Sequence, residues 1–251
     1  MKQTAIVKFY TTSAFNAYEE GKGKPLTLEE ICAYAARVSN PGNQMNHQSS
    51  GRLLNYCMRN HHWSVFEQAD VTMEINTTRD IARQILRHRS FQFQEFSQRY
   101  ADPTKDGLLT GEARAQDHKN RQNSIKEGIS DEVAAQWEAK QQQLNHEIKL
   151  AYQWALDNNI ALECARKILP EGNTPSTLYM KGSLRSWIHY IDVRFAPYEQ
   201  YVVNGAEDGI FEREIVENGT QLEHKELAEA CAKALADEVP FLKERYEQYF
   251  S

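Results

Sequence analysis

Residues 71–86 read VTMEINTTRDIARQIL. From Val71 to Ile75 every second residue is apolar, and this period is typical of a strand with one buried face. The second half carries apolar residues about one helical turn apart, and Thr77 or Thr78 can cap the start of that helix. This stretch therefore predicts a half-buried strand that passes directly into a helix.

Further strands and helices are predicted both before and after this stretch. Thr27 and Glu30 have the spacing of a capping box at the start of a helix. Residues 102–129 are polar, contain glycine and show no period, so we expect a long surface loop or insertion there. The other predicted elements are strands at 1–10 and 177–180, helices that begin near Gly51, Ser130 and Ser183, a short helix that ends near Pro170, and an amphipathic stretch over 225–249 interrupted by Pro240.

The length and composition of the chain suit one large domain. It has 251 residues, of which 41% are hydrophobic, and this is enough for a core of its own. The sequence contains no repeat, low-complexity tract or interdomain linker. We expect a single α+β domain over residues 1–251, built on a mixed or antiparallel sheet that is packed by helices.

Charge and cysteine content argue against several classes of function. A formal net charge of -6 disfavours polymeric nucleic acid and anionic membrane surfaces as partners. The cysteines form no CxxC pair and no two histidines lie four apart, so we expect no zinc or other metal site. The chain lacks a signal peptide and a run long enough to span a bilayer, which predicts a soluble protein of the reducing cytoplasm.

The stretch QILRHRSFQFQEFSQRY over residues 84–100 is the most informative for function. Three arginines, a histidine, a glutamate and two serines are crowded into it. Such a cluster repels itself unless an anion neutralises it, and the guanidinium fork matches phosphate bidentately. A solvated helix end, favourable against the helix dipole, is the alternative interpretation. If the helix continued through Arg89, then Arg87 and Arg89 would point about 200° apart.

The spacing of this cluster resembles a known family. Arg87-His88-Arg89, seven further residues and Ser97 are similar to the RHRx7S signature of the flavin-dependent thymidylate synthases, often called ThyX. The resemblance covers most of the chain and keeps the family's order. The further matching segments are Ala36-Arg37-Val38-Ser39, His62-Trp63-Ser64-Val65-Phe66-Glu67, Ala165-Arg166-Lys167-Ile168-Leu169-Pro170, and the stretch from Ser183 to His189 followed by Asp192-Val193-Arg194. The chain departs from the family at Gln68, Gln94 and His189, where the family often has His, Asn and Asn.

The resemblance implies a reaction and an assembly. A one-carbon unit would pass from 5,10-methylenetetrahydrofolate to C5 of dUMP and be reduced by FADH2 to give dTMP and tetrahydrofolate, with NADPH re-reducing the flavin. The family forms homotetramers whose active sites lie at subunit interfaces. The compartment implied is the cytoplasm, or the host cytoplasm if the chain is viral.

The resemblance also implies roles for individual residues. Arg194 would be the catalytic residue, because a fixed guanidinium can stabilise the negative charge that spreads over the uracil ring. His62 would contact the folate. The residues implied for dUMP are Gln84, Arg87, Glu95, Ser97, Gln98, Arg99, Arg166 and Arg194. Those implied for FAD are Ser39, Ser64, Glu67, Arg87, His88, Arg89, Glu95, Ser183, Arg185 and His189.

Other interpretations remain open at this point. A related pyrimidine-nucleotide hydroxymethylase would use the same nucleotide pocket, and a non-catalytic nucleotide- or RNA-binding relative could keep the arginines. Ser97 has no base at a recognisable spacing, so we expect it to donate or accept hydrogen bonds rather than to act as a nucleophile. The four cysteines, of which Cys32, Cys57 and Cys231 fall on apolar helical stretches, lack an activating context.

Overall fold

The computed structural model describes residues 3–10, 26–105, 107–204, 210–216 and 219–250, with the backbone alone over 198–204 and 210–216. A four-stranded sheet in the order β1-β2-β6-β3 forms its centre, and each neighbouring pair is antiparallel. Its strands are β1 (Thr4–Tyr10), β2 (Asp70–Thr78), β6 (Pro175–Ser183) and β3 (Gln92–Glu95). The predicted α+β class with an antiparallel sheet is confirmed.

The pairing of β2 with β6 fixes how the helices leave the sheet. Its register runs from Asp70 opposite Ser183 to Thr78 opposite Pro175. Alternate residues of β2 are buried, as the sequence predicts. A slip by one residue would turn every buried side chain to the other face, so the hydrophobic pattern holds the register. Trp187 reinforces it, because its indole Nε1 donates to the carbonyl of Val71 at 3.1 Å.

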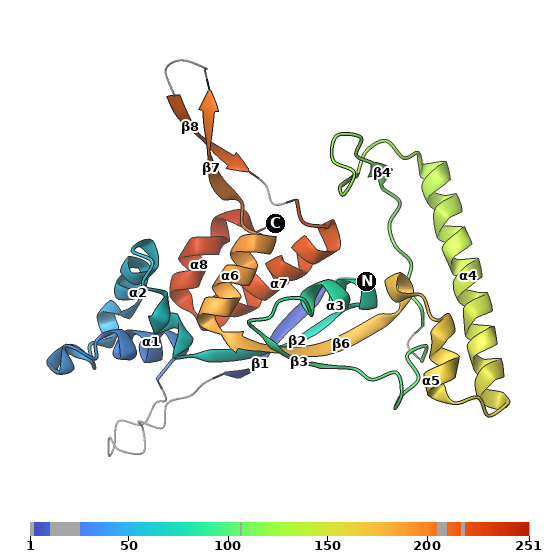
Figure 1. Ribbon diagram of the computed structural model, residues 1–251, viewed down its shortest axis with the longest axis horizontal. Helices are drawn as coiled ribbons and strands as arrows, with labels where there is room; N and C mark the ends of the chain where they lie inside the picture. The colour runs from blue at the N-terminus through green and yellow to red at the C-terminus, as the bar shows by residue number, and fades with distance from the viewer. Residues whose placement is uncertain (1–2, 11–25, 106, 205–209, 217–218, 251) are drawn as a thin grey trace.

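Three helices from the second half of the chain lie together on one face of this sheet (Figure 1). They are α6 (Leu184–Arg194), α7 (Leu222–Glu238) and α8 (Pro240–Tyr246). At one end of the sheet, α1 (Leu28–Ala36) and α2 (Ser50–Arg59) pack against the 3-10 turn η4 (Trp63–Glu67). Side chains from all these elements share one hydrophobic core with β2 and β6.

Three of the predicted helix starts are confirmed by side-chain caps, whereas the predicted cap at Thr77 or Thr78 is not formed. Thr27 and Glu30 form the predicted capping box, with the Thr27 hydroxyl accepting from the Glu30 N–H at 3.2 Å. Ser130 accepts from the N–H of Val133 at the start of α4 (Asp131–Asp157). Ser183 caps α6 in the same way. Thr78 precedes α3 (Arg79–Ile85), but its side chain makes no capping hydrogen bond.

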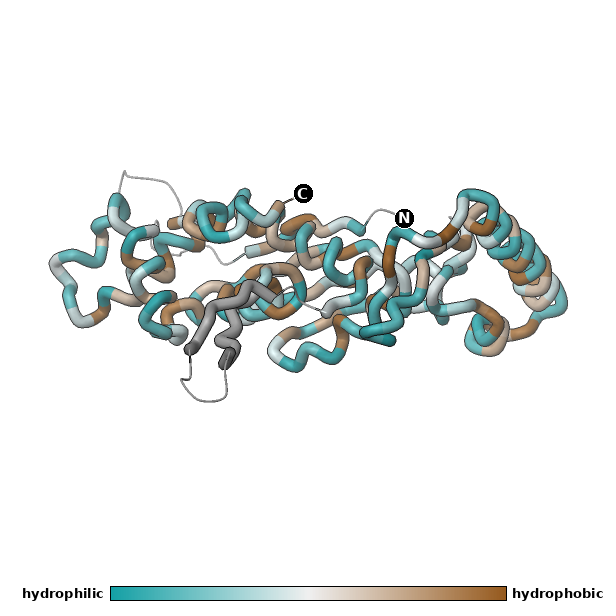
Figure 2. Tube along the Cα trace, turned by 90° about the horizontal axis from the view of Figure 1, so that it is seen from above, coloured by the Kyte–Doolittle hydropathy of each residue, from teal (hydrophilic) through white to brown (hydrophobic). Residues whose placement is uncertain are grey.

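The long helix α4 and the short α5 (Leu162–Ala165) lie at the end of the molecule opposite α1 and α2 (Figure 1). Figure 2 shows apolar and polar residues interleaved along α4. Trp137 and Trp154 on α4 are 47% and 61% exposed. These two tryptophans are therefore outside the core of one chain, whereas Tyr152 packs in a small separate cluster against α5.

Two strand pairs lie outside the elements that the sequence predicts. β7 (Tyr198–Asn204) and β8 (Ile210–Val216) form an antiparallel hairpin that projects from the body (Figure 1). The polar segment 102–129 is a loop, as predicted, that contains the short pair β4 (Ala115–Gln116) and β5 (Ser124–Ile125). Short 3-10 turns complete the chain: η2 (Pro41–Asn43), η3 (His47–Ser49), η5 (Arg166–Ile168), η6 (Glu171–Asn173) and η7 (Glu247–Tyr249). Within the described ranges, every helix is too short or too polar to cross a bilayer.

The capping box gives a test of the fold. We expect Thr27→Ala to lower the free energy of unfolding by about 1 kcal/mol, because the backbone N–H of Glu30 at the start of α1 loses the hydroxyl that accepts its hydrogen bond. Urea denaturation followed by circular dichroism measures the loss. Thr78→Ala is the matched control, since Thr78 occupies the same position before α3 without a side-chain bond. Equal losses in both variants would contradict the role of the box.

Candidate active site

The Arg87-His88-Arg89 segment follows the end of α3 and turns toward β3. The helix α3 ends at Ile85, so Arg87 and Arg89 do not lie on opposite sides of one continuous helix. Both arginines are exposed, whereas His88 is half-buried. The N–H of His88 donates to the carbonyl of Ile85 at 2.9 Å. The segment therefore turns His88 inward and leaves the two arginines outward.

His88 contacts the last residue of α6. Arg194 Nε donates to His88 Nε2 at 3.2 Å. Burial lowers the pKa of His88 to about 4, with further lowering by the positive charges of Arg194, His189 and Arg87. A guanidinium only donates, so Nε2 is the acceptor and the single ring proton lies on Nδ1. Residues more than a hundred positions apart thus form a polar contact between a cation and a neutral imidazole.

The imidazole of His88 rests on an aromatic wall. Its ring lies edge-on to Tyr190 with 5.0 Å between ring centroids. Phe91 packs edge-on against Trp187 at 4.9 Å and lies 6.0 Å from Tyr190. These rings are buried, so they exclude water from one side of the contact between His88 and Arg194.

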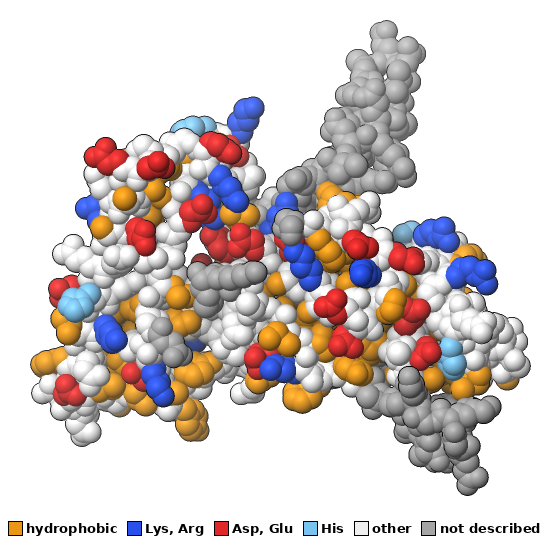
Figure 3. Space-filling model, turned by 180° about the vertical axis from the view of Figure 1, so that it is seen from behind, with side chains coloured by type: hydrophobic (Ala, Val, Ile, Leu, Met, Phe, Trp, Pro, Cys, Tyr) orange, Lys and Arg blue, Asp and Glu red, His pale blue; other side chains and the backbone are white. Residues whose placement is uncertain are grey.

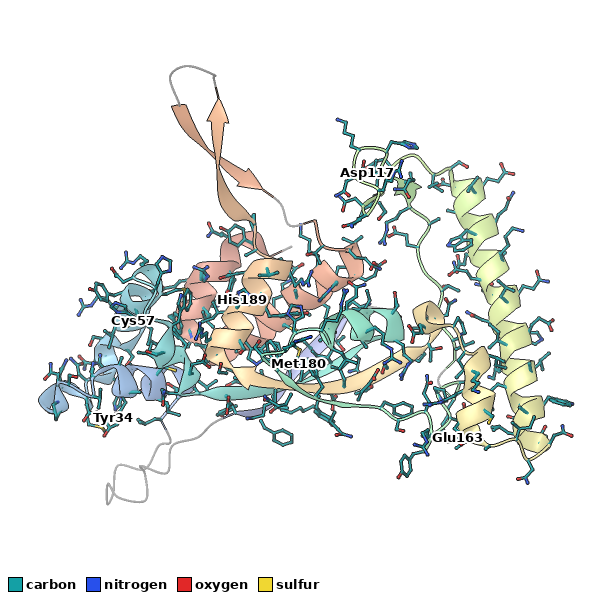
Figure 4. All side chains as sticks on the ribbon, viewed as in Figure 1. Tyr34, Cys57, Asp117, Glu163, Met180 and His189 are labelled. Atoms are coloured by element: carbon teal, nitrogen blue, oxygen red, sulfur yellow. The ribbon has the colours of Figure 1, made fainter. Side chains whose placement is uncertain are left out.

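A second group of predicted residues lines a cavity of about 470 Å³ beside α6. Arg185 bonds Glu67 across this cavity, with 3.1 Å between NH1 and Oε1. His189, labelled in Figure 4, projects from α6. The lining residues are Trp63, Glu67, Ser90, Arg185, Ser186, Ile188, His189 and Asp192. Apolar Trp63 and Ile188 next to a guanidinium, hydroxyls and an imidazole fit a flat heteroaromatic group that carries polar atoms on its rim.

A third group lies elsewhere on the chain. Arg99 pairs with Glu163 of α5, with 3.3 Å between NH2 and Oε2, and Arg166 begins the turn that follows α5. Figure 4 labels Glu163 near α4 and His189 on α6, well apart. One chain therefore does not bring Arg99 and Arg166 to Arg194. The predicted dUMP residues are divided between two half-sites.

The residues between these groups have structural partners. Glu95 accepts from Ser176 Oγ at 3.0 Å and lies 3.5 Å from Arg79 NH1. Gln98 is buried, and its Nε2 has no hydrogen-bond partner among the residues that the structure describes. Ser97 is exposed and its hydroxyl accepts from the N–H of Arg99. The half-site with Arg99 thus holds one buried amide donor that is unpaired.

The remaining predicted flavin and folate residues are scattered. Ser183 is buried, and its hydroxyl bonds Ser186 as the cap of α6, which commits it to the fold. Ser64 and His62 are exposed at and beside η4. Ser39 lines another cavity of about 470 Å³, together with two arginines and other polar residues near the end of α1.

His224 is a residue of this region that the sequence does not reveal. It lies on α7 with no solvent exposure. Its Nε2 is 3.1 Å from Tyr190 OH, and its Nδ1 is 3.3 Å from Oε1 of the predicted dUMP residue Gln84. A histidine on an amphipathic helix reads as an ordinary core or surface position, so no local signal marks it.

Three of the four cysteines have poorly nucleophilic thiols. Burial raises the pKa of the Cys32 thiol to about 12, with a further rise from Glu29, and burial also raises the pKa of Cys57 and of Cys231. These three thiols are buried, as predicted, while Cys164 is exposed. A thiol with a raised pKa is a poor nucleophile near neutral pH.

Comparisons with known proteins find relatives over most of the chain. Residues 26–241 match the family model described as thymidylate synthase complementing protein, Thy1. A probable flavin-dependent thymidylate synthase of Paramecium bursaria Chlorella virus 1 is 46% identical over 214 residues, which are 85% of this chain and 88% of the relative. The flavin-dependent thymidylate synthase of Synechocystis sp. is 46% identical over 225 residues, which are 87% of this chain and 89% of the relative.

Solved structures share the fold. A UMP/dUMP methylase, PolB from Streptomyces cacaoi, bound with 5-Br UMP superposes with a TM-score of 0.72 at 23% identity, covering 98% of this chain and 94% of the other. The same methylase bound with 5-Br dUMP gives a TM-score of 0.72 and covers 95% of its own chain. At this level of identity the likeness concerns the arrangement of helices and strands.

Two imidazoles, the half-buried His88 and the buried His224, predict an acid-sensitive fold. Burial lowers the pKa of His224 to about 3 from an ordinary 6.5, with added effects of Arg194, His88 and Arg87. At pH values between these two pKa values, the histidine is protonated in the unfolded chain and neutral in the folded chain. The free energy of unfolding is therefore highest above about pH 6.5 and decreases as the pH falls, by up to about 1.4 kcal/mol per pH unit for each such histidine.

Urea unfolding at a series of pH values measures this slope. We expect His224→Gln to show a shallower loss of stability below about pH 6.5 than the wild-type chain, because its side chain takes up no proton. His118→Gln is the control, since His118 is exposed in the polar loop. If His224→Gln kept the wild-type slope, His224 would not be the group held neutral.

Proposed function

The chain belongs to the thymidylate synthase complementing protein family, the flavin-dependent thymidylate synthases, and on this premise we propose that its separate half-sites combine in a homotetramer to hold dUMP beside FAD. It transfers a one-carbon unit from 5,10-methylenetetrahydrofolate to C5 of dUMP, and flavin reduces that unit to give dTMP and tetrahydrofolate. NADPH re-reduces the flavin. The contact between Arg194 and neutral His88 is the observation that carries the assignment of the site.

Arg194 is the residue that we assign to activation of the uracil ring. Its Nε–H is occupied by His88, and the guanidinium plane is thereby held. Its terminal nitrogens make no hydrogen bond to any described residue, so they are available to donate to a ligand. Negative charge that develops on the uracil oxygens and N3 meets a fixed cation on a partly dry surface, where such donors stabilise a transition state most strongly.

Recognition of the dUMP phosphate we assign to the half-site at the other end of the chain. Arg99 and Arg166 lie there near α5, where Arg99 pairs with Glu163, and a phosphate could take the place of that carboxylate. The unpaired, buried amide nitrogen of Gln98 supports an anion or carbonyl ligand at this position. Gln84 and Arg87 would complete the pocket from the half-site with Arg194, with Ser97 and Glu95 from the β3 side.

The flavin we place in the cavity beside α6. Glu67, Arg185 and His189 line it, and its apolar and polar lining fits an isoalloxazine ring. Ser90 also lines it, and we assign Arg87, His88 and Arg89, which precede Ser90 in the chain, to the flavin as well. When bound, the flavin supplies the reducing equivalents. Ser39 and Ser64 would reach more distant parts of the dinucleotide, Ser183 would act through the cap of α6, and His62 would contact the folate.

A homotetramer accounts for two further features of the chain. The dUMP residues lie in two half-sites that a single chain keeps apart, so a second copy must supply one of them. Apolar residues on α4, among them Trp137, Leu144 and Trp154, are exposed in one chain, and burial against another copy would remove them from water. We infer one continuous domain for each subunit.

The partners are small molecules, and we propose the cytoplasm, or the host cytoplasm for a viral chain, as the compartment. Figure 3 shows acidic and basic side chains interspersed over the face opposite Figure 1. This mixture, with a net charge of -6, disfavours a nucleic-acid polymer as the ligand.

Removal of the Arg194 guanidinium tests the catalytic assignment. We expect Arg194→Ala to bind FAD but to lower the rate of dTMP formation by about a hundredfold or more, because one pre-oriented donor to the developing charge is lost. Arg83→Ala is the matched control, since Arg83 lies on α3 in an exposed pair with Glu171. The rate of labelled dUMP turnover and the flavin absorbance band are the measurements. Wild-type turnover by Arg194→Ala would remove Arg194 from the reaction.

Mixing of two impaired variants, at a dUMP concentration too low for turnover by Arg99→Ala, tests the composite site. We expect Arg99→Ala to raise the dUMP concentration required for turnover steeply, because a phosphate ligand is lost. When subunits of Arg99→Ala and Arg194→Ala are exchanged at equal amounts, about a quarter of the sites should combine two intact halves, and activity should return to that fraction. If the exchanged mixture remains as inactive as the separate variants, both arginines serve the same chain's site.

A further inference from the structure

His224 lies at the junction of the helices that carry the site. Its ring is 5.8 Å from the ring of Tyr190 and 6.2 Å from that of His88, measured between centroids. Both ring nitrogens have a polar partner, Tyr190 OH for Nε2 and Gln84 Oε1 for Nδ1. A neutral imidazole has one donor and one acceptor, so these two contacts satisfy it completely.

From His224 a chain of hydrogen bonds runs through Gln84 and Gln221 to the carboxylate of Glu223. Glu223 accepts from Gln221 Nε2 at 3.0 Å and from Arg114 NH2 at 2.6 Å. Burial by itself raises the pKa of Glu223, but its own backbone N–H at the start of α7, Arg114 and Gln221 outweigh burial and lower the pKa overall. Glu223 is therefore ionised near neutral pH and only accepts hydrogen bonds.

The ionised carboxylate sets the direction of every bond that follows. Gln221 must turn its amide nitrogen to Glu223 and its oxygen to Gln84. Gln84 accordingly donates from Nε2 to Gln221 Oε1 at 2.7 Å and turns its own oxygen to His224. The His224 proton then lies on Nδ1, and Nε2 accepts from the hydroxyl of Tyr190. Each orientation follows from the one before it.

We propose that His224 is a positioning residue of the nucleotide site. It belongs to a hydrogen-bond chain whose direction Glu223 sets, and it holds Gln84 as a hydrogen-bond donor to dUMP. This inference deepens the proposed function and rests on it. The oxygen of Gln84 faces His224 and one of its N–H groups faces Gln221. The second N–H has no partner among the described residues, so Gln84 offers a donor to the ligand. The matching ligand atom is a phosphate or carbonyl oxygen of the nucleotide.

The same chain reaches two other parts of the molecule. Tyr190 commits its hydroxyl to His224, and this holds its ring edge-on to His88. Arg114 belongs to the polar segment 102–129 and is only 13% exposed in its side chain. That segment is thereby tied to the start of α7. Through the ion pair between Arg114 and Glu223, the segment contributes to the orientation of the Gln84 amide.

Glu223→Gln is the sharpest test, because it keeps the shape of the side chain and removes only the charge that sets the direction. An amide at this position can both donate and accept, so Gln221 and Gln84 can reverse. We expect the dUMP half-saturation concentration to rise about tenfold, the effect of one hydrogen bond, with a smaller change in kcat. Calorimetric titration of dUMP and labelled dUMP turnover measure the two quantities. Glu223→Asp should restore part of the dUMP affinity.

One further variant and two controls separate positioning from stability. Tyr190→Phe removes the hydroxyl at the other end of the chain and should also weaken dUMP binding while the flavin band persists. Tyr152→Phe and Glu226→Gln are the matched controls, since the buried Tyr152 hydroxyl has no partner within the described ranges and Glu226 is an exposed carboxylate on α7. Both controls should titrate with dUMP like the wild-type chain. Thermal unfolding of all four variants shows whether any change in affinity merely follows lost stability.

The outcomes distinguish this inference from the proposed function. If the wild-type chain forms dTMP but Glu223→Gln and Tyr190→Phe bind dUMP as the wild type does, the positioning role is wrong and the enzyme assignment stands. If the wild-type chain forms no dTMP with FAD, NADPH and methylenetetrahydrofolate, the proposed function fails first. Weaker dUMP binding in both variants, with unchanged controls and unchanged melting temperatures, supports the role of His224.

Discussion

A hydrogen bond from a guanidinium to an uncharged imidazole, Arg194 Nε to His88 Nε2, is the constraint on which the site depends. It exists only while His88 is neutral, because an imidazolium would repel Arg194 and could not accept the bond. Burial of His88 supplies that condition. The positions of the two residues are in turn fixed by the sheet, since α3 follows β2 directly and α6 follows β6. The antiparallel register of β2 and β6 sends these helices from opposite ends of the strand pair.

The neutral histidines also decide where positive charge is available. His88 and His224 add polar atoms to the region without adding charge, and the lowered pKa of each keeps it so above pH 6. Arg194 and the exposed Arg87 therefore provide the positive field near the end of α3. An anionic ligand at this half-site would meet cations that protrude from a wall of uncharged rings. This arrangement supplies a positive field without a dense cluster of cations that repel one another.

The parts of the fold that the sequence predicts are those with local physical causes. The capping box at Thr27, the caps at Ser130 and Ser183, and the alternation along β2 each depend on residues within one or two turns. β3 and the β7–β8 hairpin were not predicted. β3 lies within a polar, arginine-rich stretch and is a strand because β6 offers it an edge, a cause that lies far away in the sequence.

The features of the site also divide into those with a local signal in the sequence and those that depend on distant residues. The motif spacing around Arg87 and Ser97 is visible in the sequence, and so is the match at Arg194. The contact between Arg194 and His88 spans more than a hundred residues, and no periodicity announces it. His224 is still less visible, because its role comes from the neighbours of a buried helix face. The separation of Arg99 and Arg166 from Arg194 likewise depends on how α5 lies relative to α6.

The hydrogen-bond chain that ends at Glu223 shows why a distant ion pair can matter to the half-buried amide of Gln84. A chain of amides, an imidazole and a hydroxyl has two directions of nearly equal energy, since each member can both donate and accept. An ionised carboxylate at one end removes that degeneracy, because it cannot donate. Arg114 keeps the carboxylate ionised and at the same time ties the polar segment 102–129 to α7. The charge of Glu223, which is four hydrogen bonds away from Tyr190 in the aromatic wall, thus decides the orientation of the Gln84 amide on α3.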